Sequence, residues 1–420
     1  MSVTGPQALT AALGPRHLRR ELTLLLMVVA SLAVTSGVFE PSLNNFLNDT
    51  FHMGAERRGI LEFPRELPGF LVAILGGLLF FLSEIRIGML ATSAVALGLA
   101  GLALLGDRSY AVMIVCLVTW SVGSHMMIPV TSTITLSLAA EGKRASRMGQ
   151  VGAVGGAATI LGSGLVWIGM RWLHLSYATL FLVAGSFALC ASALVSRFHA
   201  LPHRGSQRPK LVLKRRYSLY YLLCTFSGAR KQVFITFGPW VLIKVFHQPA
   251  YVIALLYMIA SGVNVVFQPA LGKLIDHWGE RRILMLDAVM LIGVCTGYGF
   301  SRQQSWFQPV YIAYVCYVLD NILFACSMAR ATYLDKIAES KPDVHASLSV
   351  GVTIDHLVSM SIPFLGGMLW DRAGFQYVFV AASCIAACNF IAASFVRTGR
   401  HAPPSAEVEA EETAAQVAVD

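Results

Sequence analysis

Apolar segments of membrane-spanning length recur from one end of the chain to the other. A helix needs roughly 17 to 25 mainly apolar residues to cross about 30 Å of hydrocarbon. Twelve such segments can be delimited, at residues 21–42, 60–82, 87–106, 110–140, 148–170, 173–195, 217–246, 250–272, 283–300, 309–334, 346–370 and 375–396. With 56% hydrophobic and 13% charged residues, the composition also departs from that of soluble domains. The sequence therefore predicts an all-α membrane protein with twelve transmembrane helices.

The positive charges are distributed unevenly about these segments. The net charge of +9 would suggest a nucleic-acid partner in a soluble protein. If the N-terminus is cytoplasmic, however, 22 of the 32 Lys and Arg residues fall on the cytoplasmic side and 7 on the other. This positive-inside bias predicts two cytoplasmic termini and a lipid bilayer, with no nucleic-acid partner. The first segment lacks a small-residue cleavage site and is expected to be retained, in a bacterial cytoplasmic (inner) membrane.

The longest interior polar stretch divides the chain into two halves. Residues 196–218 hold seven cations, no acid and two prolines. We predict a cytoplasmic N-terminus at 1–20, six-helix bundles at 21–196 and 218–397, a basic linker at 197–217 and an acidic disordered tail at 398–420. The linker serves as an orientation signal and flexible connection, or alternatively binds anionic lipid.

A short motif joins the eighth and ninth predicted helices. The segment GKLIDHWGERR, residues 272–282, resembles the loop motif Gly-x-x-x-Asp-Arg-x-Gly-Arg-Arg of the major facilitator superfamily, with His277 where Arg or Lys is usual. The matching residues are Gly272, Asp276, Gly279, Arg281 and Arg282. The resemblance implies two pseudo-symmetric six-helix bundles, secondary transport by alternating access, and a monomer. Its first, fourth, seventh and tenth helices would line a central cavity.

The chemistry of this motif suggests a gating latch. Glycine lets helices approach closely, a carboxylate can hold a helix N-terminus, and the arginines can bridge to the other half in one conformation. The corresponding segment between the second and third helices, FFLSEIRIGML, keeps only Glu84 and Arg86 as a charged pair. We therefore expect the latch at 272–282 to matter more.

Two adjacent cations lie inside the seventh predicted helix, in the run CTFSGARKQVFITFGPW. Arg230 lies midway between Arg216 and Lys244, too deep for simple snorkelling. A lipid-facing charge there would cost about 2.5–3.5 kcal/mol, so an acid or water must lie nearby. Asp320 and Asp355 lie near the middle of their segments, and either could pair with Arg230. Lys231, turned about 100° from Arg230, could face the cavity or pack between helices.

Other ionisable residues share this membrane depth. His125 lies on the fourth predicted helix, and His356 follows Asp355 on the eleventh. We assign substrate binding to Arg230, Lys231, His125 and Asn264, and proton coupling to Asp320, Asp355 and His356. Each has a structural alternative: Arg230 with its acid as a permanent ion pair, and His125 as a core histidine bonded to Ser121 or Ser124. Asp355 and His356 need not touch, because adjacent positions on a helix point apart.

Charges also cluster at the ends of the first two predicted helices, in GVFEPSLNN and ILEFPRELPGF. Glu40, Arg65 and Glu66 form a possible outer gate. The alternative is a solvated helix entrance in which Glu62 and Glu66 flank Arg65. Two prolines, Pro64 and Pro68, predict an irregular start to the second helix there. Irregular backbone at that depth is tolerated only where water or protein covers it.

The remaining signals restrict the function. The eight cysteines fall within predicted helices as small apolar residues, so no disulfide or metal framework and no cofactor are expected. We predict a non-enzymatic secondary transporter that moves a small organic, anionic or amphiphilic solute, driven by protons. A drug or metabolite efflux antiporter is an alternative, although the fifth helix lacks the Gly-Pro pair of many such antiporters. A lipid-modifying membrane enzyme and a non-transporting sensor are alternatives of another class.

Overall fold

The computed structural model describes residues 15–78, 82–139, 143–199, 213–303 and 308–397, and these residues form helices without strands. The predicted tail, most of the N-terminal segment and the middle of the linker lie outside the described residues. The α-helices are α2 (Pro15–Phe51), α3 (Ala55–Leu78), α4 (Glu84–Leu105), α5 (Tyr110–Ser137), α6 (Arg144–Arg171), α7 (Tyr177–Val195), α8 (Ser218–Lys244), α9 (Ala250–Trp278), α10 (Glu280–Phe300), α11 (Pro309–Leu323), α12 (Ser327–Ile337), α13 (Lys341–Ala373) and α14 (Phe375–Ser394). Short 3-10 helices occupy Arg215–Tyr217 (η1), Ser301–Gln303 (η2) and Phe324–Cys326 (η3).

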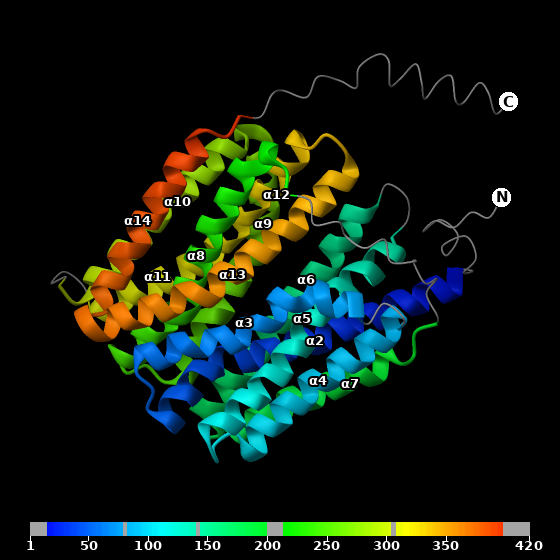
Figure 1. Ribbon diagram of the computed structural model, residues 1–420. Helices are drawn as coiled ribbons and strands as arrows, with labels where there is room; N and C mark the ends of the chain where they lie inside the picture. The colour runs from blue at the N-terminus through cyan, green and yellow to red at the C-terminus, as the bar shows by residue number, and fades with distance from the viewer. Residues whose placement is uncertain (1–14, 79–81, 140–142, 200–212, 304–307, 398–420) are drawn as a thin grey trace.

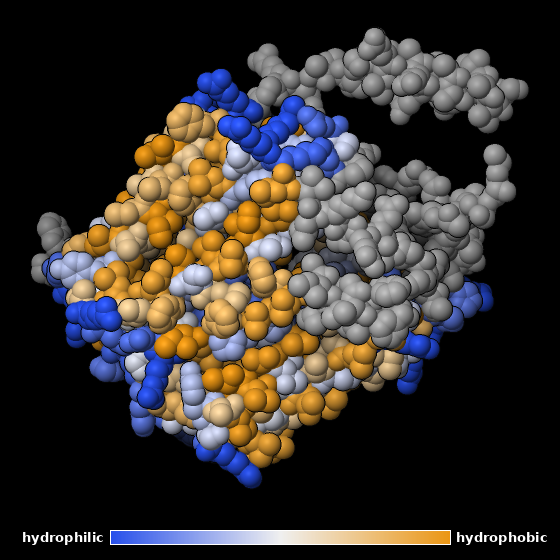
Figure 2. Space-filling model, viewed as in Figure 1, coloured by the Kyte–Doolittle hydropathy of each residue, from blue (hydrophilic) through white to orange (hydrophobic). Residues whose placement is uncertain are grey.

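The helices confirm the predicted twelve-helix membrane protein. Ten spans in the described part of the chain are long and apolar enough to cross a membrane, with α11 and α12 counted as one span. Helices α3 and α8, of 24 and 27 residues, bring the number to twelve and carry the charges discussed below. Figure 2 shows apolar residues over the middle of one face and hydrophilic residues gathered towards its edges. Side chains such as Leu97 and Val266 are exposed for lipid to cover.

Two prediction errors concern the first two helices. Helix α2 runs to Phe51, well beyond the expected residue 42. Helix α3 is continuous through Pro64 and Pro68, so the irregular start predicted from these prolines is wrong. Each proline removes one backbone hydrogen bond. The remaining turns of α3 are packed against α13 and α5, which holds the helix together in spite of that loss.

The helices form two bundles, α2–α7 and α8–α14 (Figure 1). Within the first, α2 packs against α6 and α7, and α4 packs against α5 and α7. Within the second, α8 packs against α13 and α14, and α10 packs against α14. The bundles meet through two further helix pairs, α3 with α13 and α6 with α9. This arrangement confirms the predicted architecture of two six-helix bundles.

The α3–α13 pair is tight at one end of the molecule, which we call the closed end. A Cβ atom on Gly59 would collide with the carbonyl oxygen of Pro363, and one on Gly367 would lie 2.5 Å from the carbonyl oxygen of Ala55. The Asp371 carboxylate accepts hydrogen bonds from the backbone N–H groups of Ala55 (3.3 Å) and Glu56 (3.0 Å). A carboxylate from one bundle therefore caps the N-terminus of a helix in the other.

The α6–α9 pair separates towards the opposite end, which we call the open end. Gly156 of α6 lies near Val265 of α9: a Cβ atom added to Gly156 would be 3.5 Å from a methyl group of Val265. A Cβ atom added to Gly152 or Gly149, one and two turns earlier on the same face of α6, would meet no described residue within 4 Å, and the same holds for Gly272 on α9. The bundles therefore touch at the closed end and diverge at the open end.

Candidate functional site

Two cavities adjoin the middle of α8. The central cavity, of about 440 Å³, lies between the bundles and is lined by residues of α2, α3, α8, α9 and α11. The open-side cavity, of about 320 Å³, lies among α8, η3, α12 and α13. Lys231 and Phe324 line both cavities, so the two spaces share a wall.

Arg230 is buried against α10 and α11 of the same bundle. Its guanidinium lies 3.4 Å from the Asp320 carboxylate and 3.8 Å from the Asp287 carboxylate. It also donates to the backbone carbonyls of Leu323 and Asp320, and it lies over the Phe324 ring. One cation thus faces two carboxylates.

A helix break supplies part of this site. Between α11 and α12 the chain forms the 3-10 turn η3, directly after Asp320 and Leu323. Carbonyl groups near such a break lack regular helical partners and need another donor inside a membrane. Arg230 donates to two carbonyls at this break, those of Leu323 and Asp320, and the Asp320 carbonyl also accepts from the Phe324 N–H group. No proline or glycine in 323–327 marks this break in the sequence.

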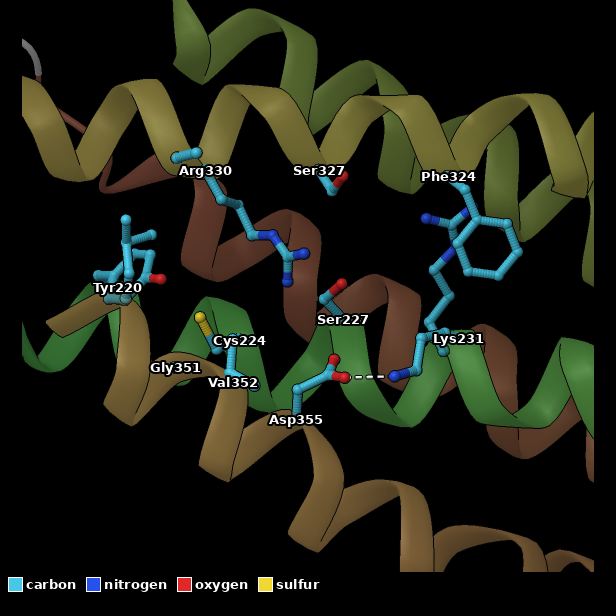
Figure 3. A pocket seen from close by; sticks show the side chains of 13 residues that line it. Tyr220, Cys224, Ser227, Lys231, Phe324, Ser327, Arg330, Gly351, Val352 and Asp355 are labelled. Carbon is cyan, nitrogen blue, oxygen red and sulfur yellow. Dashed lines mark hydrogen bonds and ion pairs between the residues drawn. The ribbon is translucent and has the colours of Figure 1, made fainter. Parts of the chain in front are cut away.

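Lys231 turns to the other side of α8 and forms an ion pair with Asp355 of α13 (Figure 3). Its side chain is 24% exposed and that of Asp355 is 22% exposed, against 10% for Arg230. The sequence left open which aspartate pairs with Arg230. The structure places Asp320 against Arg230, and Asp355 against its neighbour.

The open-side cavity is lined by three cations and one carboxylate. Its charged lining residues are Arg230, Lys231, Arg330 and Asp355. Arg330, on α12, extends into the cavity opposite Ser227 of α8 (Figure 3). Its guanidinium donates to the Leu223 carbonyl at 3.2 Å, and no ion pair joins it to another residue in the described ranges. Of the three cations, Arg230 and Lys231 have carboxylate partners, and Arg330 has none within the described ranges.

Charged residues of α2 and α3 form a buried network next to the central cavity. Glu62, fully buried, accepts hydrogen bonds from Arg58, from Arg65 at 2.8 Å and from Gln232 of α8 at 2.6 Å. Arg65 also lies 3.2 Å from Glu66 and 3.9 Å from Glu40. The expectation of a solvated helix entrance is wrong, because these side chains are enclosed between the bundles.

A second polar cluster joins the bundles through histidines. His356 Nδ1 of α13 lies 3.0 Å from a Glu66 oxygen of α3. The His125 ring of α5 meets the His356 ring edge to face, with 5.2 Å between centroids. His125 Nδ1 contacts the Ser121 carbonyl at 2.9 Å and the Ser121 hydroxyl at 3.1 Å, so Ser121 is the partner among the two serines considered. His356 and Asp355 point to different partners.

The other predicted residues lie away from these cavities. Asn264 of α9 donates to the Asn321 carbonyl at 3.2 Å and thereby joins two helices of one bundle. In the predicted latch, Gly279 has a φ of +79° and ends α9. Asp276, Arg281 and Arg282 are exposed, and no hydrogen bond or ion pair ties them to the first bundle within the described ranges. Among the described residues, the latch residues thus make no polar contact with that bundle.

Sequence reasoning missed four residues of the site. Asp287 lies in the first half of α10, away from the middle of the membrane, yet the long Arg230 side chain approaches it. Arg58, Gln232 and Arg330 carried no depth or motif signal. The spacing of Arg58, Glu62 and Arg65 at i, i+4 and i+7 was the available signal, because it places all three on one face of α3.

Comparison with known proteins gives one family. A family profile described as "Major Facilitator Superfamily" matches residues 23–353. The chain is similar in structure to a mutant form of the nucleoside transporter NupG, at 14% identity over 89% of this chain and 98% of that one, with a TM-score of 0.70. It is also similar to a D-xylose-proton symporter, at 14% identity over 90% of this chain and 98% of that one, with a TM-score of 0.68. A third similar structure is the human organic anion transporter MFSD10 (TETRAN), at 14% identity over 91% of this chain and 100% of that one, with a TM-score of 0.62. No curated protein matches the chain.

Proposed function

The chain belongs to the major facilitator superfamily, and on this basis we propose that it is a proton-coupled secondary transporter of a small organic anion. The observation that carries the proposal is Arg330, which extends into the open-side cavity beside the Lys231–Asp355 pair and has no ion-pair partner within the described ranges. Cations in a partly desolvated cavity attract an anion more strongly than cations in water do. The proposed substrate therefore carries a carboxylate or phosphate group.

Lys231 and Arg330 would make the first contacts with the anion. The Lys231–Asp355 pair is half-buried and lines the open-side cavity, so an anion there can compete with Asp355 for the ammonium. Arg330 lies across the cavity without a carboxylate partner in the described ranges. Glu40, Arg65 and Glu66 would close the central cavity towards the closed end. By the positive-inside rule, the open end would face the cytoplasm.

We assign the proton to Asp320 in preference to Asp355 and His356. Asp320 and Asp287 together place two negative charges against one guanidinium, whereas Asp355 faces one ammonium. A proton on Asp320 leaves Arg230 with one carboxylate, and Arg230 also lines the open-side cavity. Proton binding would then favour anion binding, and by linkage the anion would favour the proton.

Anion recognition can be tested by ligand-induced thermal shift on the purified protein. Organic carboxylates and phosphates are expected to raise the unfolding temperature, whereas neutral analogues of the same size leave it unchanged. With an anion so identified, Arg330→Ala should weaken binding at least about tenfold, or about 1.4 kcal/mol, and Arg330→Lys should weaken it less. Arg302→Ala, an exposed cation on η2, is the matched control. Stabilisation by neutral solutes only, or unchanged affinity in Arg330→Ala, would contradict the proposal.

Proton coupling can be tested by flux of that anion in proteoliposomes. In the wild type, an imposed pH gradient is expected to change the initial rate several-fold. Asp320→Asn should remove this response, because an amide remains neutral at either pH, while equilibrium binding of the anion persists. Asp355→Asn, which changes the aspartate paired with Lys231, should retain a response to the gradient. A wild type indifferent to pH, or a full response in Asp320→Asn, would rule out Asp320 as the proton carrier.

A further inference from the structure

Glu66, His125 and His356 point to one another from three helices, and we propose that they form a binding site for a transition-metal ion of the Zn²⁺ class that bridges the two bundles. Glu66 and His125 belong to the first bundle and His356 to the second. One ligand atom of each residue lies within 4.8 Å of those of the other two. Two imidazoles and one carboxylate are a common ligand set for zinc, with water in the fourth position.

The spacing of these atoms is close to that of a bound metal. Zinc bonds of about 2.0–2.1 Å in tetrahedral geometry place ligand atoms about 3.3–3.4 Å apart. His356 Nδ1 and the Glu66 oxygen are already 3.0 Å apart. Small rotations of the two rings would bring all three atoms to bonding distance, with the metal in place of the hydrogen now shared between His356 and Glu66.

The surroundings of His125 select the tautomer that a metal needs. The Ser121 hydroxyl donates its hydrogen to the Arg65 carbonyl, so towards His125 its oxygen can only accept. The Ser121 carbonyl also accepts only. Nδ1 of His125 therefore carries the hydrogen, and its Nε2 presents a lone pair. Metal-binding histidines are held in this way by a carbonyl on the second nitrogen.

The cluster also has room for the rings and an appropriate charge. A Cβ atom on Gly69 would lie 2.7 Å from His125 Nε2 and would collide with the His356 ring, so only glycine at this position lets the two rings meet. The second Glu66 oxygen is held by Arg65 at 3.2 Å, which fixes the carboxylate. The connected network of α2 and α3 holds three carboxylates (Glu40, Glu62 and Glu66) and two guanidiniums (Arg58 and Arg65). One negative charge is thus left over, which favours a cation.

A metal bound here would tie α3 and α5 to α13 at the interface where the bundles meet. It would stabilise the conformation in which the closed end is shut, because the ligands come together only when α3 and α13 are in contact. Binding of this ion is separate from the proposed anion site, whose lining residues do not include Glu66, His125 or His356.

The test is a metal titration of full-length protein, purified without a histidine tag and stripped with a chelator. Co²⁺ is the probe, since tetrahedral Co²⁺ absorbs strongly in the visible range, and Zn²⁺ should displace it. We expect one saturable equivalent per chain. His125→Ala and His356→Ala should each weaken binding at least about tenfold. His277→Ala, an exposed histidine on α9, should bind as the wild type does.

The experiment separates a lost site from a lost fold. Unfolding temperature and elution volume are measured for each variant without metal. His125→Ala is the decisive variant, since His125 is only half-buried and its side-chain hydrogen bonds within the described ranges all go to Ser121. Zn²⁺ should also raise the unfolding temperature of the wild type and leave that of His125→Ala unchanged. Absence of a saturable equivalent in the wild type, or equal binding by folded His125→Ala, would overturn the proposal. Neither readout depends on transport.

Discussion

Replacing Glu62 by Ala is expected to lower the free energy of unfolding by about 3–5 kcal/mol. The Glu62 carboxylate is fully buried and accepts from Arg58, Arg65 and Gln232. Its removal leaves the guanidinium of Arg58, which is only 1% exposed, without a counter-charge. Removing one partner of a buried ion pair costs more than replacing both, because the remaining charge is still desolvated. Chemical or thermal unfolding of the purified protein measures the change.

Two further variants identify the cause of this loss. Glu62→Gln keeps the shape and one acceptor oxygen but removes the charge, so its unfolding free energy should lie between those of the wild type and Glu62→Ala. Glu56→Ala, on the first turn of the same helix and half-exposed, should cost less than about 1 kcal/mol. If Glu62→Ala were as stable as Glu56→Ala, the network would contribute no net stability.

A Gly59→Val substitution should force the closed end apart and shift the protein away from the conformation described above. The Cβ of any other residue at this position would collide with the Pro363 carbonyl, and backbone cannot move aside as a flexible side chain can. Overpacking of this kind costs roughly 1–3 kcal/mol, which shifts a two-state equilibrium by about 5- to 150-fold. The rate of thiol labelling at Cys224, which lines the open-side cavity, should fall as the open end closes.

The matched control for this shift is Gly152→Ala. Its Cβ would meet nothing within 4 Å, and alanine is a better helix former than glycine, so labelling of Cys224 should not change. Slow labelling in both variants would mean that glycine loss in general, and not the α3–α13 contact, alters access. Unchanged labelling in Gly59→Val would show that the closed end tolerates the added volume and does not govern the open end.

The positions of the helices could be predicted from the sequence, and most of the contacts between them could not. Runs of apolar residues and the loop cations determine the number of spans, because the bilayer imposes one length on all of them. Depth follows from counting residues along a helix, and the three residues that this count places at one depth, Arg230, Asp320 and Asp355, line the two adjoining cavities. Which acid meets which cation depends on how each helix is rotated and tilted. That rotation is set by packing against neighbours, which a single sequence does not specify.

The wrong expectations have the same origin. The charges near the start of α3 resemble a solvated helix end when α3 is considered alone. They become a buried network only because α2, α8 and α13 cover them, and Gln232 of α8 supplies a donor from far along the chain. The break at η3 has no proline or glycine to mark it in the sequence, and the Arg230 groups that donate to its carbonyls lie on another helix.

The cap on α3 has a consequence for how freely this protein can vary. Asp371 accepts from the backbone N–H groups of residues 55 and 56, and every amino acid except proline supplies such a group. Mutational drift can therefore replace the half-exposed Glu56 by many residues without losing this contact, whereas the buried Ala55 is restricted by its packing. On the opposite bundle, one carboxylate bears the whole constraint. The hydrogen bonds of the cap are accordingly asymmetric in what they require: backbone N–H groups at residues 55 and 56, and a carboxylate at position 371.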